Sequence, residues 1–98
     1  MKKTTFSVRL SDEISVIEII ELLEHISDFL PGLNIKDFVI EYDLNTVDYN
    51  TEEVLSFKIL IRTMKKLAQN HMGYIYSFIL GYLIGHLPRN TDVKLTIE

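Results

Sequence analysis

Cysteine is absent from the 98-residue chain, and this absence excludes three kinds of chemistry. A protein without cysteine has no disulfide framework, no thiolate zinc site and no cysteine nucleophile. The composition therefore fits a reducing cytoplasm. At 47% hydrophobic residues the chain can still bury a compact core without cross-links, so we expect a single domain over residues 1–98.

Long apolar runs are also missing. The most apolar segment, MGYIYSFILGYLIG at residues 72–85, is shorter than the ~20 residues of a membrane-spanning helix and contains three glycines. The first residues, MKKTTFSVRL, alternate polar and apolar side chains and do not continue into an apolar signal core. We therefore expect a soluble, cytoplasmic protein with no membrane partner.

Basic residues are scarce in the first half of the chain. Residues 12–53 contain twelve acidic residues and one basic residue, Lys36, whereas residues 54–98 contain six basic and two acidic residues. An acidic half argues against a nucleic-acid partner, because phosphate contacts need clustered lysine and arginine. It fits a protein partner attracted by charge, or two solvated surfaces that keep a small domain soluble.

Motifs for catalysis are absent as well. The three histidines, His25, His71 and His86, are scattered and form no two-histidine metal spacing. There is no GxSxG nucleophile turn and no glycine-rich loop for phosphate. We expect a protein that is not an enzyme and has no cofactor or metal.

Alternation of polar and apolar residues predicts the first elements. Residues 4–10 alternate strictly, which predicts a half-buried strand. Ser11 offers a hydroxyl N-cap before two acidic residues, so we expect a helix from there to about Phe29, before Pro31. Residues 37–44 satisfy both periods, and their β-rich content favours a strand.

The second half predicts one more helix and two more strands. Asn50 or Thr51 would cap a helix whose cationic side contains Lys58, Arg62, Lys65 and Lys66. Residues 74–80, YIYSFIL, are rich in aromatic and β-branched residues, which favours a strand. A helix over residues 74–87, with Gly81 and Gly85 as a close-packing surface, is the alternative. Residues 93–97 alternate in a last strand.

These elements predict an α/β fold. The expected order is β-α-β-α-β-(short α or loop)-β, with two long helices on one face of a four-stranded sheet. If residues 74–87 are helical, the layout is α+β instead.

The first helix carries a narrow acidic side. At 100° per residue, its acidic residues and His25 fall within an arc of about 120°, and apolar residues cover much of the rest. The acidic residues are Glu18, Glu21, Glu24 and Asp28. So wide an apolar face is clamped against a sheet or shared with another chain, and the acidic side is a candidate contact for a partner.

The stretch DLNTVDYNTEEVL, residues 43–55, joins a predicted strand to the next predicted helix. It resembles the STAS domain, the fold of anti-sigma-factor antagonists, mainly over residues 38–73. The matching positions are Asp43, Leu44, Val47 and Leu55. The resemblance implies that the following turn opens a helix and binds a partner protein.

That turn departs from the family pattern. Thr51, Glu52 and Glu53 stand where the family has aspartate and two serines, and Val54 stands where it has glycine. The resemblance implies a phosphorylatable serine at the position of Glu53, so this switch is lost here and the fixed acidic side chain would imitate the phosphorylated form. In the alternative interpretation these residues only cap a helix.

Three functional hypotheses follow. The first is a small regulatory or inhibitory protein that binds another protein through Glu18, Glu21, Glu24 and Asp28, together with Thr51, Glu52 and Glu53. The second is a homodimer formed through the apolar helix or residues 81–87. The third, a nucleic-acid-binding regulator, would use Lys58, Arg62, Lys65 and Lys66.

Overall fold

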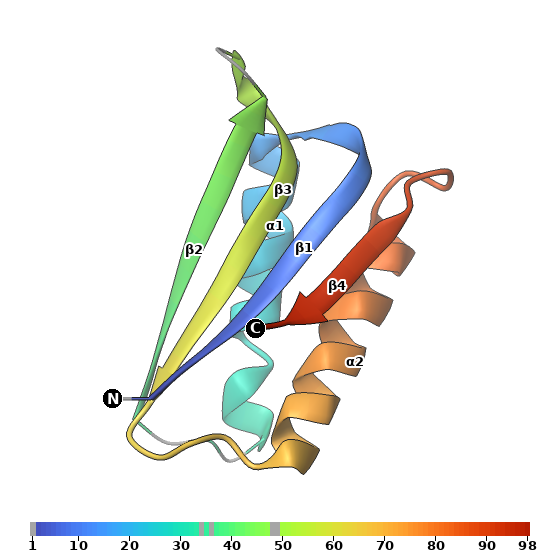
Figure 1. Ribbon diagram of the computed structural model, residues 1–98. Helices are drawn as coiled ribbons and strands as arrows, with labels where there is room; N and C mark the ends of the chain where they lie inside the picture. Colours follow the sequence, from blue (N-terminus) through green and yellow to red (C-terminus); the bar gives the residue numbers. More distant parts are fainter. Residues whose placement is uncertain (1, 34, 36, 48–49) are drawn as a thin grey trace.

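The computed structural model describes residues 2–33, 35, 37–47 and 50–98 (Figure 1). The elements follow the order βαββαβ, with one 3₁₀ turn after the first helix. They are β1 (Lys2–Ser15), α1 (Val16–Ser27), η1 (Leu30–Leu33), β2 (Phe38–Val47), β3 (Asn50–Thr63), α2 (Gln69–His86) and β4 (Val93–Ile97).

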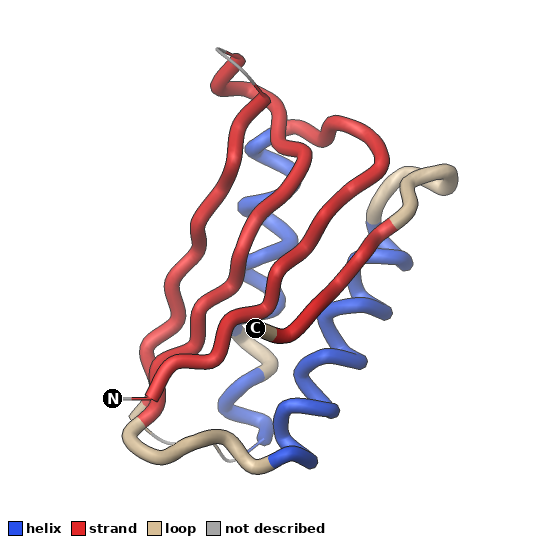
Figure 2. The backbone as a smooth tube through the Cα atoms, viewed as in Figure 1, coloured by secondary structure: helices blue, strands red, loops and turns tan. Residues whose placement is uncertain are grey.

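The four strands form one antiparallel sheet in the order β2-β3-β1-β4. Both long helices cover the same face of this sheet, and the other face is open (Figures 1 and 2). The predicted α/β class, with two helices on one face of four strands, is confirmed, in the alternative α+β layout that a helix over residues 74–87 implies. The predicted order of elements is wrong in the second half of the chain. Residues 50–63 form a strand where a helix was predicted, and residues 69–86 form a helix that includes the predicted strand over residues 74–80.

Strand β1 begins as the alternation predicts and then extends further. Phe6, Val8 and Leu10 are buried under the helices, while Arg9 is exposed on the open face. The register with β3 shifts between Arg9 and Ile14, where the strand bends. Helix α1 therefore begins four residues later than expected, and Ser15, not Ser11, is its N-cap.

The segment predicted as the second helix is strand β3. Its residues Phe57, Ile59 and Ile61 are buried on one side, which is the period of two that a strand requires. The predicted cationic helix side does not exist, because Lys58 and Arg62 lie on the open face of the sheet. Lys65 and Lys66 follow in the loop after β3.

The predicted strand over residues 74–80 is helical, and the alternative of a helix over 74–87 is confirmed except for its last residue. Ile75, Ile79 and Leu83 are its buried residues, spaced four apart. A single stripe is enough to hold the helix on the sheet. Gly81 does not serve close packing within the chain, because a Cβ placed there meets nothing within 4 Å.

The core lies between the sheet and the two helices. Its largest fully buried side chains come from the inner sides of β1 and β3, from both helices and from η1. They include Phe6, Phe57, Ile59, Ile19, Leu23, Ile26, Ile75 and Ile79. Within the described ranges, no helix is both long and apolar enough to cross a membrane.

Candidate functional site

Helix α1 presents its acidic side to solvent. Glu18, Glu21 and Glu24 are exposed on the helix, and Asp28 is exposed as its C-cap. The opposite side, which includes Ile19 and Leu23, is buried against the sheet, so the apolar stripe fixes the direction in which the acids point. The four carboxylates predicted as a contact therefore share one accessible side of one helix.

The start of α1 is set by Ser15. Its Oγ accepts a hydrogen bond from the backbone N–H of Glu18 at 3.2 Å, which satisfies one of the free donors of the first turn. Glu18 also lies in that turn, where the helix dipole favours a negative charge. Glu18, the first of the four acidic residues, is thus held at the capped N-terminus of α1.

The other predicted contact residues lie at the beginning of β3 and not at a helix cap. Glu52 is exposed and Glu53 is half-buried. The register pairs Glu53 with Ser15, which brings Glu53 beside the start of α1. The side chain of Thr51 lies outside the described residues. The STAS resemblance implies a helix in this segment, and the structure has a strand there.

A groove of about 470 Å³ runs between the two helices. Its lining residues are Glu18, Glu21, Leu22, His25, Tyr82, His86, Leu87 and Pro88. Two carboxylates from α1 thus face a phenol and an imidazole from α2. Glu24 and Asp28 belong to the same acidic side but lie outside the groove lining.

Aromatic rings continue from this groove along α2. Tyr82 stacks on His86 with 4.0 Å between ring centroids, and Phe78 lies 5.6 Å from Tyr82. Phe78 in turn stacks on Phe29 with 3.8 Å between ring centroids, which joins α2 to the turn that follows α1. The imidazole of His86 donates through Nδ1 to the carbonyl of Tyr82 at 2.8 Å, so its ring orientation is fixed.

This arrangement suits a cationic side chain. A guanidinium or ammonium group is attracted both by carboxylates and by the face of an aromatic ring within ~6 Å. Across residues 2–33, 35, 37–47 and 50–98, no group of three or more histidine, aspartate or glutamate residues is arranged to hold a metal ion.

Sequence reasoning missed the α2 wall of the groove. Tyr82 and His86 follow the segment that was expected to be a strand, so they were not placed opposite the acids of α1. The four-residue spacing of Ile75, Ile79 and Leu83 was the signal that could have revealed the helix.

Comparisons with known proteins give a fold and no family. No protein-family model and no curated protein matches the chain. The de novo designed protein LFR1 1, which has a ferredoxin fold, matches with a TM-score of 0.66 and 13% identity, covering 100% of this chain and 86% of that chain. The de novo designed protein Foldit4 has a TM-score of 0.60 and 12% identity, with coverage of 99% and 97%.

A natural enzyme contains the same fold as a part. An amidase of the hydantoinase/carbamoylase family from Burkholderia phymatum matches with a TM-score of 0.60 and 15% identity. The match covers 98% of this chain but only 28% of the amidase. At these identities the likeness concerns the fold alone, and the chain has a ferredoxin-like α/β fold.

Proposed function

We propose that this chain is a small, non-enzymatic regulatory or inhibitory protein of the cytoplasm that binds another protein through the acidic side of α1. The observation that carries the proposal is the groove of about 470 Å³ between the helices, which Glu18 and Glu21 line on α1 and Tyr82 lines on α2. A partner that inserts a lysine or arginine would meet carboxylates and a ring face together.

The remaining acids extend this contact along the helix. Glu24 and Asp28 are exposed beyond the groove, and no lysine or arginine lies within α1 to neutralise them. Such a one-sign surface attracts a basic partner over several ångströms and repels acidic ones. We therefore expect affinity for the partner to fall as salt rises, because exposed charges are screened.

The test is capture of the partner from a lysate of the source cells, followed by titration of the purified partner. The double variant Glu18→Lys/Glu21→Lys reverses the groove carboxylates, and Asp12→Lys/Asp92→Lys changes the net charge equally at exposed residues outside α1. We expect the first variant to lose the partner and the second to keep it.

A third variant separates the ring from the charges. Tyr82→Leu keeps an apolar side chain of moderate size but removes the aromatic face, and we expect a several-fold weaker affinity with unchanged salt dependence. Equal binding by the wild type and Glu18→Lys/Glu21→Lys, at low and at high salt, would show that α1 is not the contact.

A homodimer is the second candidate, and the outer side of α2 favours it. Helix α2 contains no acidic residue, lysine or arginine, and Tyr74 and Ile84 are 58% and 60% exposed. Gly81 and Gly85 are exposed with open space around them, so another helix could approach closely there. Light scattering over a range of concentrations tests this, since a concentration-independent monomer mass excludes it.

A further inference from the structure

The open face of the sheet contains a groove that lies away from both helices (Figure 1). It has a volume of about 330 Å³ and lies across β1, β3 and β4, with one residue from β2. Side chains directly opposite each other on neighbouring strands share a face. The strand register arranges the polar lining residues in two rows that cross the strands. The first row is Lys58, Ser7 and Thr96, and the second row is Asn45, Ser56, Arg9 and Lys94.

The second row contains two cations directly opposite each other. Arg9 on β1 is paired with Lys94 on β4, and both are exposed. Like charges in this position destabilise a strand pair, and neither has an acidic partner among the described residues. An anion bound between Arg9 and Lys94 would relieve the repulsion between their charges.

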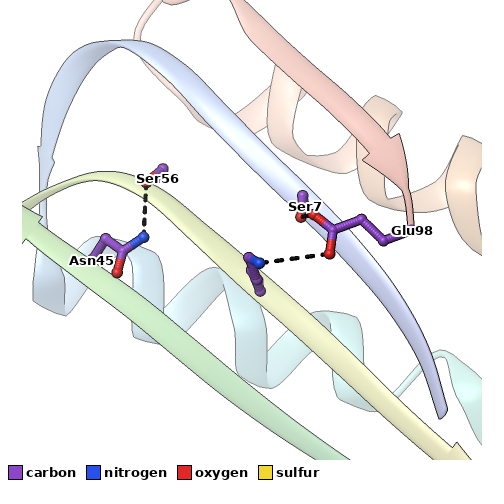
Figure 3. Close-up of polar contacts among 5 residues, drawn as sticks. Ser7, Asn45, Ser56 and Glu98 are labelled. Atoms are coloured by element: carbon purple, nitrogen blue, oxygen red, sulfur yellow. Dashed lines mark hydrogen bonds and ion pairs between the residues drawn. The ribbon is translucent and has the colours of Figure 1, made fainter.

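The first row already binds a carboxylate of the same chain. The hydroxyl of Ser7 donates to Oε1 of Glu98 at 2.5 Å, and Nζ of Lys58 lies 3.5 Å from Oε2 (Figure 3). The hydrogen bond from Ser7, assisted by Lys58, lowers the pKa of the Glu98 carboxyl. The groove therefore stabilises a negatively charged oxygen group at one end.

The hydroxyls of this face are positioned to donate. Asn45 donates to the Oγ of Ser56 at 3.3 Å, so the proton of that hydroxyl is directed to another acceptor (Figure 3). Ser56 lies directly opposite Arg9. One guanidinium, one ammonium and one hydroxyl thus come together in a single row, which is the donor set that phosphate oxygens prefer.

We propose that the open face of the sheet binds the phosphate group of a small ligand between Arg9, Lys94 and Ser56, and that the Glu98 carboxylate competes with it for Lys58. The site lies on the opposite face from α1, so the inference does not depend on the function proposed above. Displacement of Glu98 would leave Lys58 free to join the other two cations on the phosphate.

The size and lining of the groove favour a small molecule over a nucleic-acid strand. The volume is at the lower end of small-ligand sites, which span ~300–1,000 Å³. Single-stranded nucleic acid is held by stacking on aromatic side chains, and neither polar row contains one. Glu41 and Asp43 would also repel a strand that continued across β2.

The experiment is a titration of the ¹⁵N-labelled protein followed by amide chemical shifts. The probes are inorganic phosphate, glycerol 3-phosphate, and a twelve-nucleotide oligothymidylate at matched ionic strength. We expect saturable shifts at Arg9, Ser56 and Lys94 with both phosphates. Shifts spread evenly over Lys65, Lys66 and Arg89 would show non-specific screening, and tighter binding of the oligonucleotide would favour a nucleic-acid surface; either result overturns the proposal.

Two variants with matched controls sharpen the test. Lys94→Gln should weaken phosphate binding about tenfold, equal to about 1.4 kcal/mol, whereas Lys65→Gln should not. Glu98→Gln should tighten it several-fold. Its control is Glu41→Gln, which removes the same charge and breaks a different ion pair of the same face, in which Glu41 lies 3.2 Å from Arg62. Equal effects of the two glutamate variants would contradict the competition by Glu98.

Discussion

Tyr42 joins the edge strand β2 to helix α1, and this contact predicts how stability depends on pH. Its hydroxyl donates to the carbonyl of Leu23 at 2.9 Å and contacts the hydroxyl of Ser27. Ser27 donates to the same carbonyl at 3.0 Å. Burial, with smaller effects of Asp28 and Glu24, raises the pKa of Tyr42 from 10.0 to about 12.

The direction of the pH effect follows from this shift. The folded protein disfavours the phenolate, so the contribution of Tyr42 to stability is fully present below pH 10 and is lost as pH rises toward 12. Two pKa units correspond to at most about 2.7 kcal/mol. Tyr42 is only half-buried, and solvent screening reduces the expected loss to on the order of 1 kcal/mol.

The assay is urea unfolding at several pH values between 8 and 11.5, for the wild type and Tyr42→Phe. At pH 8 the variant should be less stable by about 1 kcal/mol, because one hydrogen bond is lost. The difference should shrink above pH 10, since only the wild type must keep the phenol protonated. Tyr74→Phe is the matched control, because Tyr74 is 58% exposed on α2.

One result would refute this reasoning. If the difference between the wild type and Tyr42→Phe stayed constant from pH 8 to 11.5, folding would not raise the pKa of Tyr42. The contact between β2 and α1 would then stabilise the protein equally with the phenol and with the phenolate.

Two further substitutions test the core and the outer side of α2. Ile59→Ala should lower the free energy of unfolding by about 2–5 kcal/mol, because Ile59 is fully buried at the centre of β3. Leu60→Ala, on the open face, should lower it less. Equal losses in urea unfolding would contradict the assignment of Ile59 to the buried side of β3. Gly81→Ala should raise the stability of the monomer by about 1 kcal/mol, since the added methyl group has open space; a loss at low protein concentration would show that another segment packs there.

Three of the four strands could be predicted because one side of each is buried or half-buried under the helices. Phe6, Val8 and Leu10 show the alternation in β1, and Leu95 is the buried residue of β4. Strand β3 carries the same signal in Phe57, Ile59 and Ile61, but a hydroxyl, two glutamates and regularly spaced cations together also satisfy a capped helix. The pairing of β3 between β1 and β2 decided between the two patterns.

Helix α2 was predicted only as the alternative to a strand, for the opposite reason. Its aromatic and β-branched residues favour a strand when propensity alone is considered, yet tertiary packing overrides propensity. Only Ile75, Ile79 and Leu83 are buried, and the side chains between them, such as Tyr76 and Phe78, are half-buried. The acidic side of α1 could be predicted from one helix, whereas the groove needs two helices placed side by side, which is a tertiary fact.

The acidic first half and the basic second half of the sequence do not correspond to two halves of the folded protein. The two long helices contain three acidic residues and no lysine or arginine, whereas the groove on the open face of the sheet contains Arg9, Lys58 and Lys94. The same alternation that turns Phe6 and Val8 toward the helices turns Arg9 away from them. The helical side is therefore acidic, whereas the open face carries cations together with the carboxylates of Glu41, Asp43 and Glu98.

The distance between the acidic side of α1 and the open face of the sheet determines how strongly the two proposed sites interact. Packed layers lie ~10 Å apart, and the Debye length at physiological ionic strength is ~8 Å. Charge reversal of Glu18 and Glu21 should therefore leave phosphate binding at the sheet nearly unchanged in 0.15 M salt. It should strengthen that binding slightly at 0.01 M salt, where the Debye length is ~30 Å and added positive charge reaches the far face. Loss of phosphate binding in that variant at both salt concentrations would mean that the two faces communicate through the packing of α1 on β3 and not through their charges.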